Sequence, residues 1–321
     1  MVRFIALRLA ALIASLVLAS AVIFYVLRKL PGESAGATLG VGTTVDQLDL
    51  LRAELGTDLP VWQQYTSWIA SLFDGSTTSF ISREPVSELI TSKLPITLPL
   101  SIAAFVVAVL ISIPLGVIAG VYRESVVGVV VSALSQLGLA IPVFWVGLLL
   151  VWWFALRERW LPSGGFPRTG WEDPGAAITS LVLPVVTIAI AMSSVMVRYI
   201  RSATIDVVQS DYIRTARSLG YSMWGALARH GLRNGAVPVV AILGIELATS
   251  LLGAVVVENV FALPGLGTLL LTAVTGRDFP VVQNLVLLLT VVVLVMNFLV
   301  ELLQRAIDPR LQATSAAGAS A

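Results

Sequence analysis

Six long apolar stretches constrain this chain more than any other feature of its sequence. A helix needs about 20 mostly apolar residues to cross the hydrocarbon core of a bilayer. Stretches of this kind lie at residues 9–27, 96–121, 129–155, 178–197, 236–257 and 281–303. Only 12% of the residues are charged, whereas soluble domains carry about 25%. The sequence therefore predicts an all-α, polytopic membrane protein with six transmembrane helices, and it excludes a soluble enzyme.

The first apolar stretch has some features of a cleaved signal peptide. It follows Arg3 and Arg8 and contains Ala19-Ser20-Ala21, which imitates a signal-peptidase site. The apolar region of a secretory signal is about 7–15 residues long, whereas this one runs for 19 residues, past that site to Leu27. We therefore expect an uncleaved first span, with a cleaved signal peptide as the alternative.

Proline and glycine recur inside the expected spans. The prolines are Pro99, Pro114, Pro142, Pro184 and Pro238. Membrane helices tolerate proline because neighbouring helices satisfy the freed backbone groups. The simpler interpretation is that these prolines kink helices for packing, and the alternative is that the kinks shape a central pathway. The small residues that would let helices approach closely include Gly116, Gly120, Gly244 and Gly253.

Basic residues predict the side of the membrane on which each loop lies. With the N-terminus inside, the inner segments 1–8, 122–128, 198–235 and 304–321 hold eleven of the twenty Lys and Arg residues. Five of the other nine lie in or beside segment 28–95, which counts weakly because long loops follow the positive-inside rule poorly. Eleven against four predicts that both termini are cytoplasmic.

Two of the loops are long enough to carry structure of their own. The outer segment 28–95 is polar, with eight acidic and five basic residues, and has room for a small helical cap. The inner segment 198–235 holds six arginines. We interpret residues 1–310 as a single transmembrane domain. The remainder, 311–321, is rich in Ala, Ser and Gly, so we expect it to be disordered.

The residue types that several kinds of chemistry require are scarce. The two lysines, Lys29 and Lys93, lie outside any Gly-x-x-x-x-Gly-Lys-[Ser/Thr] loop, so the chain has no such cradle for a nucleoside triphosphate. One histidine and no cysteine leave little for a metal site. A net charge of +1 indicates no nucleic-acid partner. We expect no catalytic residue, no bound cofactor and no metal.

Glu246 is the carboxylate that the apolar pattern places in the middle of a span. An ionisable residue at that depth is costly and is a functional candidate by default. Glu246 either lines the pathway of a transported solute or is a protonated or paired structural residue. One carboxylate in six spans does not make a convincing ion-coupling site, because secondary transporters usually need several such groups.

The inner segment contains a short predicted helix from Asp211 to Leu219. An acidic residue at its start suits the helix dipole, and Gly220 follows as a typical helix end. Helical spacing places Tyr212, Ala216 and Leu219 one above the other. A second short helix is expected at 223–233. Helices of this kind either dock onto a partner or lie along the membrane surface as anchors.

Short stretches along nearly the whole chain carry a resemblance to one family. They are Leu30-Pro-Gly-Glu-Ser34, Leu51-Arg-Ala-Glu-Leu-Gly56, Pro85-Val86 with Leu94-Pro95, Ile141-Pro-Val-Phe-Trp145, Asp211-Tyr-Ile-Arg-Thr-Ala-Arg217 with Gly220, His230-Gly-Leu-Arg-Asn234 with Pro238, Gly253-Ala-Val-Val-Val-Glu258, Pro264-Gly-Leu-Gly267, Arg277-Asp278 and Asp308-Pro-Arg310. In this order and spacing, they resemble the permease subunits of binding-protein-dependent ABC importers. Within that family the chain is similar to the dipeptide, oligopeptide and nickel branch, and to its first permease subunit, which has a long first outer loop.

The resemblance implies a type I ABC importer permease fold in the cell membrane and a division of labour between subunits. The inner loop would form a coupling helix in a groove of separate cytoplasmic ATPases, either two subunits or one fused subunit, which bind ATP and Mg. A homologous second permease would complete the pathway in the lipid bilayer. An extracytoplasmic solute-binding protein would deliver peptides, touching segment 28–95. The residues assigned to the ATPase interface are Asp211, Tyr212, Thr215, Ala216, Leu219 and Gly220.

The chain departs from the family pattern in a few places. The general loop pattern begins with Glu, whereas here Asp211 and Tyr212 precede Ala216. Phe73-Asp-Gly-Ser76 stands where Gly-Asp-Leu-Gly is expected in the outer loop, so the contact with the binding protein is expected to differ. Glu246 stands where a neutral polar residue is more usual.

The leading hypothesis is a permease subunit for peptide import, driven by ATP hydrolysis in partner subunits. Within the same family, the alternative is a permease for nickel or another small solute. A stand-alone channel or secondary transporter and an intramembrane enzyme are alternatives from other classes. The arginine-rich inner loop, together with the missing nucleotide-binding lysine, favours the permease subunit over the enzyme.

Overall fold

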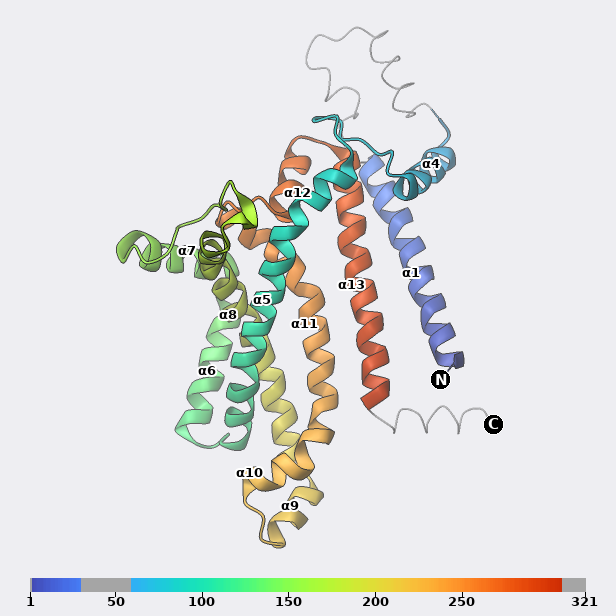
Figure 1. Ribbon diagram of the computed structural model, residues 1–321. Helices are drawn as coiled ribbons and strands as arrows, with labels where there is room; N and C mark the ends of the chain where they lie inside the picture. Colours follow the sequence, from blue (N-terminus) through green and yellow to red (C-terminus); the bar gives the residue numbers. More distant parts are fainter. Residues whose placement is uncertain (1, 30–58, 308–321) are drawn as a thin grey trace.

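The computed structural model describes residues 2–29 and 59–307, and these residues are almost entirely helical (Figure 1). Extended pairing within this part is limited to an isolated antiparallel bridge between Thr78 and Pro85. The stretches at 30–34, 51–56 and 308–310 that carry the family resemblance lie outside the described residues, as do part of the outer segment and the tail at 311–321.

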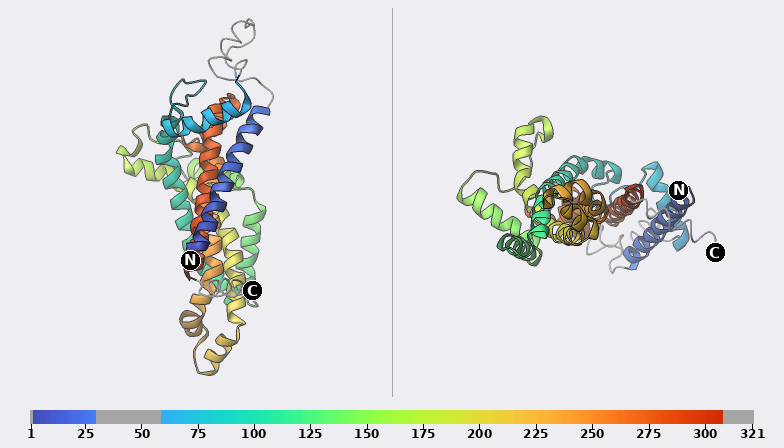
Figure 2. Two further views of the ribbon diagram at one scale, coloured as in Figure 1. Left: turned by 90° about the vertical axis from the view of Figure 1, so that its right-hand side faces the viewer. Right: turned by 90° about the horizontal axis from the view of Figure 1, so that it is seen from below.

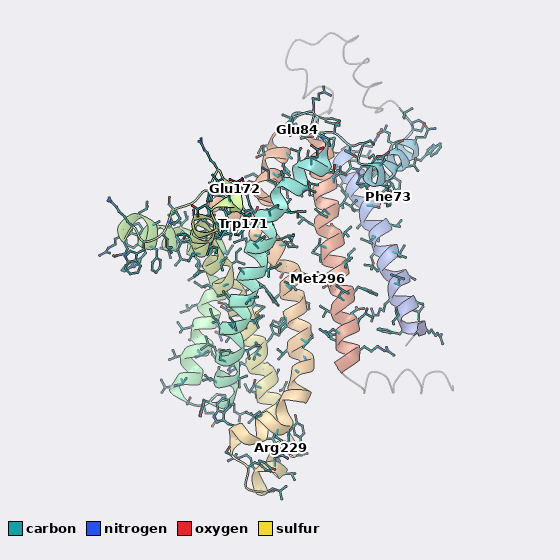
Figure 3. The ribbon with its side chains drawn as sticks, in the orientation of Figure 1. Phe73, Glu84, Trp171, Glu172, Arg229 and Met296 are labelled. Atoms are coloured by element: carbon teal, nitrogen blue, oxygen red, sulfur yellow. The ribbon has the colours of Figure 1, made fainter. Side chains whose placement is uncertain are left out.

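Short helices mark the two ends of a bundle of long ones. At one end lie α9 (Asp211–Ser218) and α10 (Met223–Ala226), and at the other lie α4 (Val61–Asp74) and α12 (Leu266–Thr275) (Figure 1). Arg229 is labelled at the first end and Glu84 at the second (Figure 3). Because basic residues favour the cytoplasm, we call these the inner and outer ends.

The centre of the bundle is the contact between α5 (Val86–Val121) and α8 (Pro174–Val208), which run parallel to each other. Gly116 lies against Ile200, and Gly120, one turn later, lies against Thr204. A Cβ atom added to either glycine would come within 2.7 Å or 2.5 Å, respectively, of a carbon of the facing side chain. Both distances are far below carbon–carbon contact, so only glycine permits this approach.

The same close contact extends along α5 at every fourth position. The buried small residues of this row are Ala104, Ala108, Ser112, Gly116 and Gly120. Lipid tails are as apolar as side chains, so membrane helices associate through close packing of small residues rather than through the hydrophobic effect. Of the most apolar part of α8, 67% is buried, against 6% for the N-terminal helix. The α5–α8 pair is therefore the core to which the other helices attach.

Two further long helices and the N-terminal one complete the bundle. Helix α11 (Leu232–Val260) packs on both α5 and α8, and α13 (Phe279–Ile307) packs on α11. Helix α1 (Val2–Lys29) rests on α13 and stands apart from the core helices (Figures 1 and 2). This arrangement explains why α1 is so little buried.

The expectation of one continuous helix over residues 129–155 is wrong. The structure has α6 (Val126–Ala140) and α7 (Val143–Leu150), the latter continuing as a π-helix at Val151–Arg157, with a bend of 100° between the two parts. Pro142 is the cause, because it lacks an N–H and forces the preceding residue out of the helical conformation. Ile141 is accordingly extended. Within residues 2–29 and 59–307, five helices are long and apolar enough to cross a membrane, or six if this bent pair forms one span.

The chain nevertheless reaches the outer half of the bundle before α8 begins. Trp171, just before α8, donates an indole hydrogen bond of 2.8 Å to the carbonyl of Pro95 in the outer part of α5. The α6–α7 segment therefore connects the inner end of α5 with the outer part of the bundle, as a third crossing must.

Other helices are longer than the apolar stretches predicted. Helix α5 begins at Val86 instead of residue 96, and α8 continues to Val208 instead of residue 197. The predicted outer loop ending at 95 and the inner loop beginning at 198 are both shorter in the structure. The prolines that lie within continuous helices are Pro95, Pro99, Pro114, Pro184 and Pro238.

A bulkier residue at Gly120 should separate α5 from α8. We expect Gly120→Val to destabilise the fold by about 1–3 kcal/mol, because the added atoms overpack a filled contact. Gly253→Val is the matched control, since Gly253 also lies in a membrane helix but has no atom within 4 Å of an added Cβ. Thermal unfolding of the two purified variants gives the comparison. Equal melting temperatures would contradict the assignment of this contact as the core.

Candidate functional site

Helix α9 is the most exposed regular element at the inner end of the bundle, and it confirms the predicted helix. It begins after Ser210, which is extended, and it has Asp211 in its first turn. Gly220 adopts a left-handed conformation with φ of +93°. The Tyr221 amide bonds the Ala216 carbonyl, and the Gly220 amide bonds the Arg217 carbonyl. This pair of bonds is a Schellman helix end, so the glycine is required by its backbone conformation.

Two side chains of α9 hold it against its own chain. Ile213 is fully buried and Ala216 is 4% exposed. Both belong to a cluster with Val207 of α8 and with Ala226 and Leu227 that follow α9. The Ala216 side chain therefore packs on its own chain, and its assignment to the ATPase interface stays a prediction. Tyr212, Ala216 and Leu219 were predicted to lie one above the other on a helix. The helix is present, but its buried side runs through Ile213 and Ala216, whereas Tyr212 and Leu219 are exposed.

The remaining predicted interface residues form the outward surface of α9. Leu219 is 74% exposed and Tyr212 is 37% exposed. Asp211, Thr215 and Gly220 are exposed as well. Arg214 lies 3.5 Å from the Asp211 carboxylate, in an exposed pair that contributes little to stability. We name the set Asp211, Tyr212, Thr215, Leu219 and Gly220 the α9 surface. It combines apolar and polar groups, as protein interfaces do.

The segment after α9 is attached to the inner end of α5. The Trp224 indole lies 3.3 Å from the Tyr122 hydroxyl, and their ring centroids are 6.2 Å apart. The expected helix at 223–233 is not separate: α10 continues through a π-helical turn (Leu227–Gly231) directly into α11. The α9 surface is therefore held by α8, α5 and α11 together.

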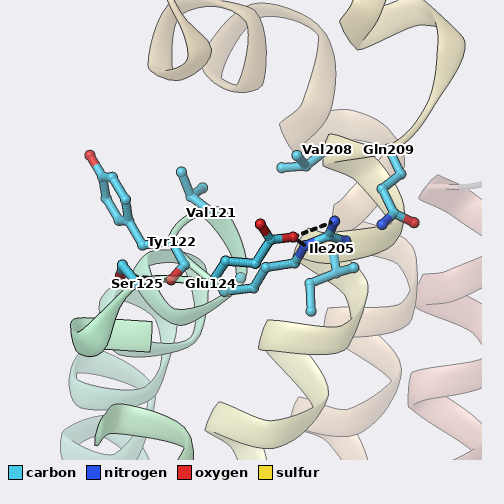
Figure 4. Close-up of a pocket in the computed structure, with 9 residues that line it drawn as sticks. Val121, Tyr122, Glu124, Ser125, Ile205, Val208 and Gln209 are labelled. Atoms are coloured by element: carbon cyan, nitrogen blue, oxygen red, sulfur yellow. Dashed lines mark hydrogen bonds and ion pairs between the residues drawn. The ribbon is translucent and has the colours of Figure 1, made fainter. Parts of the chain in front are cut away.

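A cavity of about 370 Å³ lies beside this junction (Figure 4). The turn between α5 and α6 forms one wall, with Tyr122 and Glu124, and the end of α8 forms the other, with Ile205 and Val208. On the first wall, Arg123 forms an ion pair of 3.1 Å with the adjacent Glu124. The space lies where α8 leads toward α9, so the two walls are not in close contact at the inner end.

Glu246 is half-buried in α11, and within the described part of the chain no hydrogen bond or ion pair is recorded for its side chain. Its backbone carbonyl accepts a bond from the Thr249 hydroxyl at 3.1 Å, as is common along membrane helices. The structure thus offers no arginine partner for Glu246 among the described residues. Its role in a pathway stays a prediction.

At the outer end lies a buried carboxylate, Glu258, for which the sequence predicted no role beyond the family resemblance. Its side chain is fully buried near the end of α11. The Thr97 hydroxyl of α5 donates a bond of 2.5 Å to one carboxylate oxygen, and the Gly267 amide of α12 donates one of 2.6 Å to the other. Thr97 in turn accepts from the Leu266 amide at 2.9 Å. One carboxylate therefore ties together α5, α11 and α12.

The glycines beside Glu258 make this network possible. A Cβ on Gly265 would lie 2.2 Å from a Glu258 oxygen, and one on Gly267 would lie 2.4 Å from the Val255 Cα of α11. The carboxylate meets the N-terminus of α12, where unpaired amides and the helix dipole favour negative charge. The available signal was an acidic residue followed closely by Gly265 and Gly267, but its partner Thr97 is too far along the chain to be found from spacing.

A second buried carboxylate ties the outer segment to the bundle. Asp278, between α12 and α13, is 4% exposed. It accepts bonds from the Ser79 hydroxyl at 2.5 Å and from the Phe80 amide at 3.1 Å. Asp278 belongs to the stretches that carry the family resemblance, but the sequence predicted no role for it. Together, Glu258 and Asp278 fix the outer end.

Removing the Thr97 hydroxyl should loosen the outer end. We expect Thr97→Val to lower stability by about 1–3 kcal/mol, because the Leu266 amide loses its buried acceptor and Glu258 loses a donor. Thr97→Ser keeps the hydroxyl and is expected to remain close to the wild type. Thermal unfolding of the purified complex measures both. A Val variant as stable as the Ser variant would show that the hydroxyl does not link these helices.

A family model described as "Binding-protein-dependent transport system inner membrane component" matches residues 112–313, and a second, described as the N-terminal part of such membrane components, matches residues 1–101. The glutathione transport system permease protein of Salmonella choleraesuis (strain SC-B67) is 36% identical over 313 residues, covering 97% of this chain and 99% of that protein. A protein of Brucella abortus (strain 2308), named as a peptide transport system permease, is 35% identical over 306 residues, covering 95% and 97%.

Solved structures share the fold. A subunit in an inward-facing structure of the MetNI methionine ABC transporter aligns with a TM-score of 0.58 and 19% identity, covering 70% of this chain and 99% of that one. A chain from a crystal structure of an amino acid ABC transporter with histidines aligns with a TM-score of 0.51 and 20% identity, covering 68% and 94%. At such identities the likeness concerns the fold alone.

Proposed function

We infer that this chain, which belongs to the family of binding-protein-dependent transport system inner membrane components, forms half of the membrane pathway through which an ABC importer takes up peptides. Members of this family are membrane permease subunits, and ATP hydrolysis belongs to separate subunits. Relatives named for peptide and glutathione transport match this chain over nearly its full length. Peptides are therefore the favoured cargo, and nickel or another small solute is the alternative.

The observation that carries the proposal is the α9 surface. Leu219 and Tyr212 are exposed at the inner end, while Ile213 and Ala216 fasten the same helix to α8 and to the segment after α9. A partner that binds the α9 surface would therefore displace α8 together with α9, and not a flexible loop alone. Because α8 packs tightly on α5, the displacement would pass into the membrane core.

The partners follow from this division of labour. We propose that two cytoplasmic ATPase subunits, or one fused subunit, bind ATP and Mg and engage the α9 surface. A homologous second permease would form the other half of the pathway. An extracytoplasmic solute-binding protein would deliver cargo at the outer end, where segment 28–95 begins. Ligand-driven closure of the ATPases would then open the pathway to one side at a time.

Uptake into proteoliposomes distinguishes the two cargo classes. The chain is reconstituted with its second permease, ATPases and binding protein, and uptake of a radiolabelled tripeptide and of ⁶³Ni²⁺ is compared. We expect ATP-dependent uptake of the tripeptide and none of nickel. Nickel uptake without peptide uptake would replace the peptide assignment by its alternative, and uptake without ATPases would contradict the importer assignment altogether.

A charge on the α9 surface should uncouple transport. We expect Leu219→Asp to reduce uptake and cargo-stimulated ATPase activity about tenfold or more, because a carboxylate would be buried in an apolar contact without a partner. Leu219 is 74% exposed on its own chain, so the variant chain should still fold. Ser218→Asp adds the same charge at a neighbouring exposed position. If both variants lose activity equally, the effect is one of general charge and the assigned contact is wrong.

Glu246→Gln tests the proposed pathway role of this carboxylate. The change keeps size and hydrogen bonding but removes the charge, so a counter-charge for a peptide amino group would be lost. We expect uptake of peptides with a free N-terminus to slow about threefold relative to N-acetylated peptides, because an ion pair that is open to water in the pathway contributes at most about 1 kcal/mol. Equal uptake of the two peptide classes, with normal expression, would remove Glu246 from the pathway.

A further inference from the structure

Helix α4 lies across the outer ends of two membrane helices. Figure 2 shows it nearly perpendicular to α1 and α13, which run along the bundle. The Tyr65 hydroxyl lies 2.8 Å from the Ser20 hydroxyl of α1, and the Trp68 indole donates a bond of 2.9 Å to Asn284 of α13. The Phe24 ring of α1 meets both aromatic rings, at 5.4 Å and 6.0 Å. These contacts fix the height and the rotation of α4.

Helix α4 lies at the depth of the interface between the outer leaflet and water. Ser20 precedes the end of α1 at Lys29 by nine residues, or about 13 Å at the helical rise of 1.5 Å per residue. Arg28, in the last turn of α1, donates a hydrogen bond to Gln64. The Tyr65 side chain therefore extends from α4 toward the apolar middle of α1, whereas Gln64 lies beside the basic outer end of α1. Such basic residues typically lie among lipid headgroups.

The rotation gives α4 one side that no part of the described chain covers. Trp62 is 66% exposed and Phe73 is 88% exposed. The two are eleven residues apart, which at about 100° per residue places them within about 20° of each other on the helix. They form one stripe with the half-buried Ile69 between them.

The polar side of α4 shows which way this stripe points. Gln63, Ser67 and Asp74 share one side of the helix, and Tyr65 lies opposite its middle. The Ser76 hydroxyl and amide hydrogen-bond to the Asp74 carboxylate and hold its pKa below the usual value, so Asp74 stays charged at neutral pH. With this side in water, Tyr65 points into the membrane. Trp68 and Trp62 then flank it by about 60° each, Trp68 toward α13 and Trp62 away from it.

We propose that α4 is an interfacial helix, with Trp62, Ile69 and Phe73 embedded among the headgroups and upper acyl chains of the outer leaflet. Tryptophan and other aromatic residues are enriched at this depth, because their rings suit a boundary between water and hydrocarbon. Helix α4 has no Lys or Arg, so its binding would rest on apolar area rather than on anionic lipid.

The stripe continues an apolar surface that the spanning helices already present to lipid. On α1, beside α4, Leu18 is 66% exposed and Val22 is 51% exposed. A docking protein would have to reach below the headgroups to cover a stripe on this side of α4. Lipid is therefore the occupant that the geometry favours, and a protein partner is the competing outcome of the test.

Depth-dependent quenching tests the proposal in the complex of both permeases and the ATPases, before the solute-binding protein is added. Because the chain has no cysteine, single variants Trp62→Cys, Phe73→Cys and, as control on the polar side, Ser67→Cys can each carry one bimane label with cysteine-free partners. The complexes are placed in phosphatidylcholine nanodiscs containing lipid spin-labelled at carbon 5. We expect labels at 62 and 73 to be quenched by this lipid about twofold more than the label at 67, and iodide in the buffer to show the reverse order.

Two results would overturn the proposal. If labels at 62 and 73 are as accessible to iodide as the label at 67, the stripe lies in water. If they are protected from iodide only after the solute-binding protein is added, the occupant is that protein rather than lipid. Should Trp62→Cys fail to assemble, Phe73→Cys alone decides, because the Phe73 side chain is almost wholly exposed.

Discussion

The close approach of α5 and α8 is the constraint on which the rest of this structure depends. In lipid, helices gain little from burying apolar side chains against each other, so close packing has to hold them together. The row of small residues on α5, ending in Gly116 and Gly120, lets the backbone of α5 meet α8 over several turns. Helix α11 packs on this pair, α13 packs on α11, and α1 packs on α13.

Different interactions stabilise the two ends of the bundle. At the outer end, the buried carboxylates of Glu258 and Asp278 accept hydrogen bonds from helices and segments far apart in the sequence. Such bonds are hard to replace where water is excluded, so they favour a rigid outer end. At the inner end, α9 is held by apolar packing and turns its remaining side chains outward. A rigid outer end and an exposed inner surface suit a subunit that is moved from the cytoplasmic side.

How much could be predicted from the sequence differs from one element to another. Apolar length located α1, α8, α11 and α13, because that length is set by bilayer thickness. It failed at Pro142, where a local backbone constraint divided an otherwise continuous apolar run. In α9, Gly220 gave the helix end correctly, whereas the burial of Ala216 depended on Val207 and Leu227, which no local pattern identifies. Glu258 was missed for the same reason, since its partner Thr97 lies 161 residues away.

We propose that α9, α8 and α5 move as one unit when the partner ATPases act. The most direct measurement is a pulsed electron spin resonance distance between spin labels at Ser218→Cys on α9 and Glu124→Cys just beyond α5, in the importer with cysteine-free partners. Both positions are exposed, so the labels should not disturb packing. If the three helices move together, the distance distribution has the same mean and the same width in the nucleotide-free complex and in the complex trapped with ATP. A shift of several ångströms or a clear broadening between the two states would show that α9 moves independently of α5 and that the three helices are not one unit.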